Sequence, residues 1–245
     1  MNFFVPTGIS TIDDALRGGI PLPGVTEIFG EPGCGKTRIC MEICKNAMFS
    51  SSIRKGGVSA LFIDTVSTFR CTEFREMLRN GVEQSKCMLL SPTNMDELLA
   101  VIAGLRKIAK NIPSLGVVAI DCFGHPFRCS RISSDQIELA KILNNVHQDL
   151  LQASRHFGFA VGKYGISCLS RGNERLVLFP VLTNQLTVDM KDGYATVPAL
   201  GESWGQCAGM RLEIVRGLDS CVTVNLFKSP FGEGVRSNPS DAKCS

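Results

Sequence analysis

Residues 30–37 read GEPGCGKT and fit the pattern G-x-x-x-x-G-K-[ST]. Residues 25–29, VTEIF, are typical of a short buried strand, and apolar side chains recur at helical spacing over residues 38–49. A phosphate-binding loop requires this order of strand, loop and helix, because the backbone N–H groups at the helix start then point at an anion. A chance glycine turn explains neither the flanks nor the Lys-Thr pair, so the stretch predicts a nucleotide site.

The residues of this loop have distinct expected roles. Gly33 and Gly35 allow backbone N–H groups to turn toward phosphate oxygens, Lys36 contacts the β- and γ-phosphates, and the Thr37 hydroxyl ligates Mg²⁺. The predicted nucleotide-binding residues are Gly30, Glu31, Pro32, Gly33, Cys34, Gly35, Lys36 and Thr37.

Asp121 is the second residue with expected chemistry. It ends the apolar run GVVAID at residues 116–121, which is typical of a central strand. A carboxylate at the end of such a strand can bind the Mg²⁺ shell through water. The alternative is an aspartate that merely ends a strand, but the phosphate loop upstream favours the metal role for Thr37 and Asp121.

Composition limits the class of protein. The chain has 245 residues, 44% of them hydrophobic, which suits one sizeable α/β domain. The net charge is +3, so binding to an acidic polymer must depend on local patches. The 11 cysteines are odd in number, scattered and without a C-x-x-C pair, which favours a reduced intracellular compartment over a secreted disulfide framework or a zinc site. Without a leader or a long apolar run, we expect no membrane association.

Alternating strand and helix patterns predict a mostly parallel sheet flanked by helices. The predicted helices are residues 10–17, 72–80, 94–111 and 134–157, of which the third has Asn94 as its cap and Glu97 in a capping box. Further strands are predicted at residues 60–64, 181–184, 210–215 and 221–227. We expect one domain over residues 1–236 and a flexible tail at 237–245.

Five strings together identify a family resemblance. In chain order they are GGIPLPGVTEIFGEPGCGKT, DTVSTFR, DCFGHPFR, LTNQLT and PALGESWGQ. They resemble the ATPase core of the RecA-type eukaryotic recombinase and its paralogues, most closely the C paralogue, over roughly residues 6–230. The resemblance implies a RecA-like P-loop NTPase core that binds ATP and Mg²⁺, a nuclear location and a role in homologous recombination.

The resemblance also implies a DNA-binding surface. Gln185 would sense the γ-phosphate and couple it to two DNA-binding loops. The first loop, residues 125–134, contains Arg128 and Arg131; the second, residues 187–199, contains Lys191. Three cations neutralise few phosphates, so we expect modest affinity for single-stranded DNA. Ordinary solvated loop charge is the alternative interpretation.

The sequence departs from the family at the position that activates water. Members with vigorous ATPase activity have a glutamate in the D-T-E-G string, where this chain has Val66, followed by Ser67 in place of glycine. Valine can neither accept a proton nor orient water, and losing such a group costs on the order of 10²–10⁴ in rate. The chain is therefore expected to bind ATP with weak or no hydrolysis. Glu73 stands where an adenine-stacking arginine is common, and Arg70 or Arg75 are possible substitutes.

A second departure lies at the front of the chain, which begins about five residues before the core. We expect the chain to lack the small helical DNA-binding domain and the F-x-x-A linker segment that precede the core in full-length recombinases. We therefore expect the core not to extend a filament in both directions. It would bind one end of a recombinase filament or pair with another paralogue.

Residues 162–180 interrupt the family pattern. Deleting them joins HFGFAV to VLTNQ and restores an unbroken strand. The segment is either a surface excursion with a second strand-like run at residues 176–179 or a translated in-frame intron, because Gly-Lys-Tyr and Phe-Pro can be encoded by donor-like and acceptor-like junctions. Transcript sequencing distinguishes the two.

The leading hypothesis is an ATP-binding recombinase paralogue that acts as a mediator, stabilising or remodelling recombinase filaments on single-stranded DNA during recombination and replication-fork repair. One alternative is an active DNA-dependent ATPase that performs strand exchange itself. Another is a scaffold with a vestigial nucleotide site.

Overall fold

The structure is a computed structural model. It describes residues 3–22, 24–49, 57–69, 71–78, 86–112, 114–155, 161–162, 165–166, 179–189, 195–217 and 222–231.

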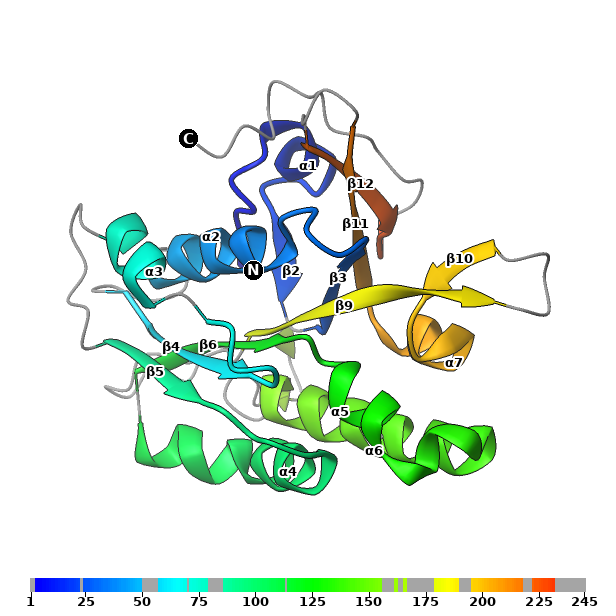
Figure 1. Cartoon of the computed structure of the whole chain (residues 1–245). Coiled ribbons are helices and arrows are strands. Elements are labelled where there is room, and N and C mark those ends of the chain that lie inside the picture. The colour runs from blue at the N-terminus through cyan, green and yellow to red at the C-terminus, as the bar shows by residue number, and fades with distance from the viewer. Residues whose placement is uncertain are drawn as a thin grey trace.

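One twisted sheet forms the centre of the molecule (Figure 1). Its strands lie in the order β12-β11-β3-β9-β6-β4-β5, and β10 pairs with β9 outside this path. All neighbours from β11 to β5 are parallel, whereas β11 with β12 and β9 with β10 are antiparallel. The bounds are β3 Thr26–Gly30, β4 Ser59–Asp64, β5 Cys87–Leu90, β6 Leu115–Asp121, β9 Phe179–Asp189, β10 Ala195–Pro198, β11 Met210–Arg216 and β12 Val222–Lys228. The predicted mostly parallel α/β core is thereby confirmed.

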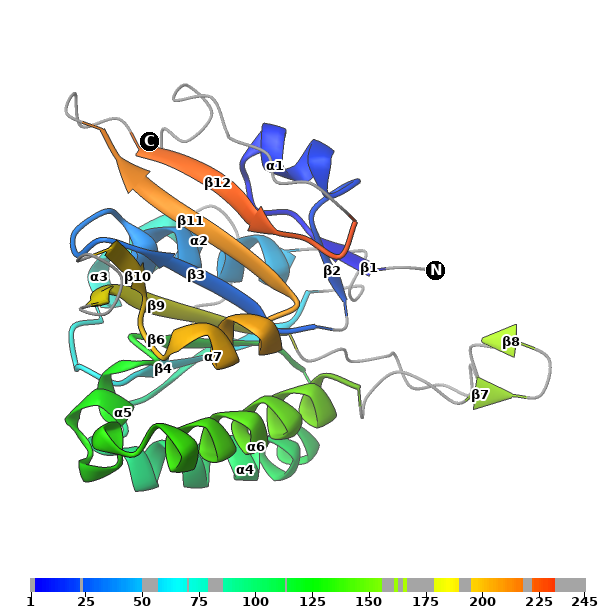
Figure 2. The same ribbon diagram turned by 90° about the vertical axis from the view of Figure 1, so that its right-hand side faces the viewer.

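Helices cover both faces of this sheet (Figures 1 and 2). Helices α2 and α3 lie on one face, and α4 and α6 lie on the other. The bounds are α1 Ser10–Ala15, α2 Lys36–Phe49, α3 Cys71–Leu78, α4 Met95–Asn111, α5 His125–Cys129, α6 Gln136–Arg155 and α7 Gly201–Cys207, with a 3₁₀ turn at Arg131–Ser134. None of these helices is long and apolar enough to cross a membrane.

Alternation along the central strands divides the core into two halves. On β4, Ala60 and Phe62 pack in the cluster with α2, while Leu61 and Ile63 pack in the cluster with α4 and α6. Successive strand residues point to opposite faces, so a strand covered on both sides is apolar throughout. This explains why β4 and β6 appear in the sequence as unbroken apolar runs that end in Asp64 and Asp121.

Two small pairs lie outside the central sheet. Strand β1, Phe3–Val5, pairs antiparallel with β2, Ile20–Leu22, and β7, Val161–Gly162, pairs with β8, Gly165–Ile166. Strand β9 begins at Phe179, and Phe179 and Pro180 pair with β6. The end of the interrupting segment thus contributes to the strand that contains Gln185. Residues 163–164, 167–178 and the predicted tail at 237–245 lie outside the described residues.

Side-chain caps set the helix starts. At α4, Asn94 accepts the Glu97 N–H at 2.9 Å, as predicted for the cap, whereas Glu97 accepts the N–H of Thr93 at 2.7 Å, one residue before the position that a capping box uses. The predicted start of α6 at residue 134 was early. Asp135 accepts the N–H groups of Ile137 and Glu138, so the helix begins at Gln136 and residue 134 belongs to the preceding 3₁₀ turn.

Candidate nucleotide-binding site

The phosphate loop follows β3 and leads directly into α2. Gly33 and Gly35 have φ values of +76° and +98°, a region that glycine adopts without steric cost. A Cβ placed on either would have no neighbour within 4 Å, so protein atoms do not fill the concave side of the loop. The loop borders a cavity of about 680 Å³. An open turn of backbone at the start of a 14-residue helix fits the phosphate groups of a nucleotide.

Lys36 lies in the floor of this loop and is only 7% exposed. Its ammonium donates hydrogen bonds to the carbonyl oxygens of Gly30 at 3.0 Å and Glu31 at 2.7 Å. Carbonyl groups satisfy the buried cation without an opposite charge beside it. The ammonium can exchange these partners for phosphate oxygens, which are stronger acceptors.

Thr37 and Asp121, the two residues predicted to bind Mg²⁺, come together across 84 residues of sequence. The Thr37 hydroxyl donates to Asp121 Oδ2 at 2.9 Å, and the Thr183 hydroxyl donates to Asp121 Oδ1. Burial raises the pKa of Asp121, while the hydrogen bonds from Thr183 and Thr37 oppose that rise. Hydroxyl and carboxylate oxygens are the ligands that Mg²⁺ prefers, so this pair fits the ion.

The turn after β4 is organised by Asp64, which is buried. Its Oδ1 accepts the Val66 N–H at 3.1 Å and its Oδ2 accepts the Phe69 N–H at 2.6 Å. Ser67 lies between them at φ +56°, a left-handed conformation in which a side chain is strained. The turn therefore retains the backbone shape that suits a glycine at Ser67, while Val66 supplies only an apolar side chain.

Gln185 lines the same cavity. Arg128 from α5 contacts the Gln185 side chain. Arg128 Nη2 donates to Gln185 Oε1 at 2.7 Å, and Gln185 Nε2 lies 3.9 Å from the sulfur of Cys122. Burial raises the pKa of the Cys122 thiol to about 11, so the sulfur is neutral near pH 7. The structure thus joins the predicted phosphate sensor to a predicted DNA-binding arginine.

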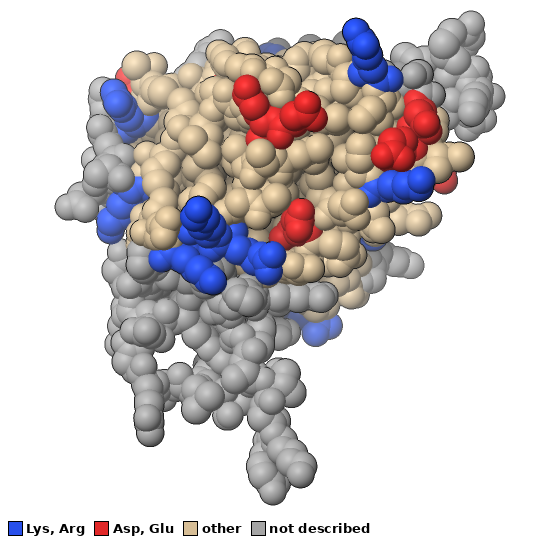
Figure 3. Space-filling view, turned by 90° about the horizontal axis from the view of Figure 1, so that it is seen from below, with Lys and Arg blue, Asp and Glu red and all other residues tan. Residues whose placement is uncertain are grey.

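The first predicted DNA-binding loop is largely helical. Residues 125–129 form α5, with Pro126 in its first turn, and exposed Arg131 opens the 3₁₀ turn. In the second, residues 186–189 of β9 pair antiparallel with residues 195–198 of β10, and Lys191 lies outside the described residues. On the α4 and α6 face, Lys and Arg are interspersed with Asp and Glu (Figure 3).

Two cavity residues were not predicted from the sequence. Arg216, at the end of β11, donates to the Gly33 carbonyl at 3.3 Å, and Arg38 lies 3.7 Å from Glu73. Arg38, Glu73 and Arg216 all line the cavity, so Glu73 faces the nucleotide site beside a cation. Parallel pairing of β11 with β3 places Arg216 beside the loop. The sequence signal for Arg216 was a basic residue directly after the strand predicted at residues 210–215.

Comparison with known proteins identifies the family. The family model described as Rad51 matches residues 2–161, more than half of the chain. The chain belongs to the Rad51 family. The match ends at Val161, where the interrupting segment begins, and the predicted resemblance to a RecA-type recombinase paralogue is confirmed.

Three curated relatives extend the similarity over most of the chain. DNA repair protein RAD51 homolog 3 of Cricetulus griseus is 30% identical over 257 aligned residues, which cover 93% of this chain and 63% of the relative. The protein of the same name in Dictyostelium discoideum is 26% identical, with coverages of 91% and 60%. DNA repair and recombination protein RadA of Metallosphaera sedula is 28% identical, with coverages of 86% and 61%. The chain therefore spans less than two thirds of the length of these relatives.

Proposed function

We propose that this Rad51-family chain binds ATP with Mg²⁺, hydrolyses it slowly, and acts in the nucleus as a mediator that stabilises or remodels recombinase filaments on single-stranded DNA. The observation that carries the proposal is a complete phosphate loop and Thr37–Asp121 pair beside a turn that has Val66 in place of an acid. Nucleotide binding and ATP hydrolysis use different residues, so a site can retain nucleotide binding and lose hydrolysis.

The chain's own groups suffice for binding. Lys36 and the backbone N–H groups at the start of α2 contact the phosphates, and Thr37 and Asp121 bind the metal shell. Mg²⁺, when bound, neutralises charge on the phosphate oxygens. Arg38 and Arg216 add positive charge at the cavity wall, where Glu73 opposes it.

The partners in this proposal are a eukaryotic RecA-type recombinase, another recombinase paralogue and single-stranded DNA. A nucleotide that persists in the site would keep Gln185, and the Arg128 bonded to it, in one state for a long time. A mediator that stabilises filaments needs such a long-lived state, whereas repeated strand exchange needs turnover.

A binding assay beside a turnover assay tests the proposal on the purified chain. We expect saturable Mg²⁺-dependent binding of a fluorescent ATP analogue and turnover at most about a hundredth of that of an active recombinase. Lys36→Ala should abolish binding. Lys45→Ala, which removes a surface lysine paired with Glu42 on the same helix, is the matched control and should leave binding unchanged.

The alternatives give different results in the same pair of assays. Rapid DNA-stimulated turnover by the purified chain would favour an active strand-exchange ATPase. Absence of nucleotide binding, with the chain shown to be folded, would favour a scaffold with a vestigial site. Adding the partner paralogue to the turnover assay shows whether a carboxylate supplied in trans compensates for Val66.

A further inference from the structure

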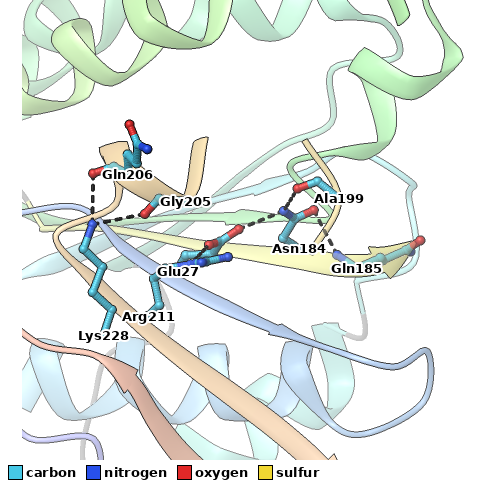
Figure 4. Close-up of polar contacts among 8 residues, drawn as sticks. All are labelled: Glu27, Asn184, Gln185, Ala199, Gly205, Gln206, Arg211 and Lys228. Carbon is cyan, nitrogen blue, oxygen red and sulfur yellow. Dashed lines mark hydrogen bonds and ion pairs between the residues drawn. The ribbon is translucent and has the colours of Figure 1, made fainter. Parts of the chain in front are cut away.

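A buried charge lies on the strand that enters the phosphate loop. Glu27 of β3 is fully buried, and its two carboxylate oxygens have different partners (Figure 4). Oε2 accepts from Arg211 Nε at 2.7 Å, and Oε1 accepts from Asn184 Nδ2 at 2.8 Å. We call Glu27, Asn184 and Arg211 the Glu27 network. A carboxylate in the interior costs free energy unless it is paired, and here both oxygens are used.

Asn184 connects this network to Gln185 and to the second predicted DNA-binding segment. Its Nδ2 also donates to the Ala199 carbonyl at 2.7 Å, and its Oδ1 accepts the Gln185 N–H at 2.9 Å. The Ala199 N–H in turn donates to the Gln185 carbonyl at 2.8 Å. One asparagine thus fixes the backbone of Gln185 and joins the two ends of the β9–β10 hairpin (Figure 4).

Arg211 is itself restrained on several sides. Its guanidinium lies 4.8 Å from the ring centroid of Phe29 and 5.3 Å from that of Phe227. A Cβ on Gly205 of α7 would lie 2.8 Å from Arg211 Nη1, so the absence of a side chain there admits the guanidinium. Lys228 Nζ donates to the carbonyl oxygens of Gly205 at 3.1 Å and Gln206 at 2.9 Å. The hairpin therefore leads into a helix that is fixed to the same network.

We propose that Glu27 is a positioning residue for Gln185: through Asn184 it sets the sensor backbone and closes the base of the β9–β10 hairpin, so that the γ-phosphate site and the DNA-facing hairpin move as one unit. The proposal rests on the proposed function for the meaning of Gln185, but its contacts belong to the protein alone.

The carboxylate gives Asn184 a unique orientation. An asparagine amide can rotate and exchange its oxygen and nitrogen, because the two ends have similar size. Glu27 and the Ala199 carbonyl both only accept, so together they require Nδ2 on their side, and this leaves Oδ1 for the Gln185 N–H. A neutral glutamine at position 27 has one acceptor for two donors, Arg211 Nε and Asn184 Nδ2, so one contact is lost.

Two variants disturb the network from opposite ends. Glu27→Gln removes one acceptor. Gly124→Ala leaves the ion pair intact but places a Cβ 2.6 Å from Asn184 Oδ1, which must then move away from Gln185. Gly124 has φ −71°, so alanine fits its backbone. The matched control is Glu213→Gln, the same carboxylate-to-amide change at a residue outside the Glu27 network, where Glu213 accepts from Asn225 Nδ2 at 3.0 Å between β11 and β12.

Two readouts separate positioning from general loss of structure. The first is hydrogen exchange, without added nucleotide, of peptides covering residues 195–200, with a β6 peptide as the reference. The second is the ratio of affinities for adenylyl imidodiphosphate and ADP, because only the former presents a γ-phosphate to Gln185.

Both variants should accelerate exchange at residues 195–200 by at least about fivefold, the effect of one lost hydrogen bond, with β6 unchanged. The preference for the triphosphate should fall by about fivefold while ADP affinity stays constant. Unchanged exchange in a folded variant, or equal losses for both nucleotides, would overturn the proposal. If Glu27→Gln does not fold, Gly124→Ala decides it alone. If the wild-type chain binds neither nucleotide, the proposed function fails, and the exchange measurement alone decides the role of Glu27.

Discussion

At the scale of single residues, the turn at Val66 and Ser67 retains a glycine-like backbone without the acidic side chain. Ser67 has a φ of +56°, and the Asp64 carboxylate accepts the N–H groups of Val66 and Phe69 on either side of it. We therefore expect the missing carboxylate, rather than the backbone of the turn, to limit turnover.

The double variant Val66→Glu, Ser67→Gly should raise ATP turnover by about 10²-fold, because a positioned carboxylate supplies general-base or water-orienting catalysis. Steady-state phosphate release with and without single-stranded DNA measures it. Ser67→Gly alone is the control and should relieve strain without changing turnover. No gain in the double variant would show that the geometry of the site, and not only its base, has been lost.

Arg128 contacts Gln185, and we expect it to contact DNA as well, together with Arg131 and Lys191. Replacing Arg128, Arg131 and Lys191 by Ala should weaken single-stranded DNA binding and reduce the slope of log affinity against log salt by about 2, since each lost phosphate contact removes about 0.7. Fluorescence anisotropy over a salt series measures the slope.

The matched control replaces Arg106, Lys107 and Lys110, three exposed cations on α4, by Ala. The charge lost is the same, so a general electrostatic effect would lower both slopes equally. An unchanged slope in the first triple variant would locate the DNA contacts elsewhere or on a partner.

At the scale of elements, the start of α4 is set by its N-cap, Asn94. Asn94→Ala removes the acceptor of the Glu97 N–H and should lower the free energy of unfolding by about 1 kcal/mol. Urea denaturation should show a lower midpoint with an unchanged m-value. Asn145→Ala, in an exposed position within α6, is the control and should change stability by less than about 0.7 kcal/mol, the range of helix propensities. Equal losses in both variants would contradict the capping role.

At the scale of the whole molecule, β5 is the last strand of the sheet within the described part of the chain, and its edge is apolar. Leu89 and Leu90 are 42% and 37% exposed, although both belong to a strand that pairs with β4 on its other side. An exposed apolar edge strand favours addition of a partner segment, and leaving it open promotes aggregation. We expect the proposed recombinase or paralogue partner to cover this edge.

Leu89→Lys should raise the soluble yield of the chain expressed alone and reduce its co-purification with the partner by at least about tenfold, since a charge is costly in a paired apolar interface. Ile137→Lys, which alters a side chain 72% exposed on α6, is the control and should preserve co-purification. Retention of the partner by Leu89→Lys would exclude the β5 edge as the interface.

The sequence by itself determined the phosphate loop, the strand that ends in Asp121, the Asn94 cap and the parallel α/β class. Each of these depends on neighbouring residues or on periodicity within one element, which a sequence displays directly. Short elements were missed for the same reason. Strand β5 has 4 residues and α7 has 7, too few to show a period, and the first predicted loop is largely the helix α5.

Only the tertiary structure decided which distant side chains meet. Arg128 contacts Gln185 across 57 positions, Arg216 contacts Gly33 across 183, and Glu27 contacts Asn184 across 157. These contacts follow from the strand order β11-β3-β9-β6, which places the phosphate loop between the strands of Arg216 and Gln185. Local periodicity specifies that a strand is buried but not which strand lies beside it, because any apolar strand can pair with any other until packing of the whole sheet selects one order.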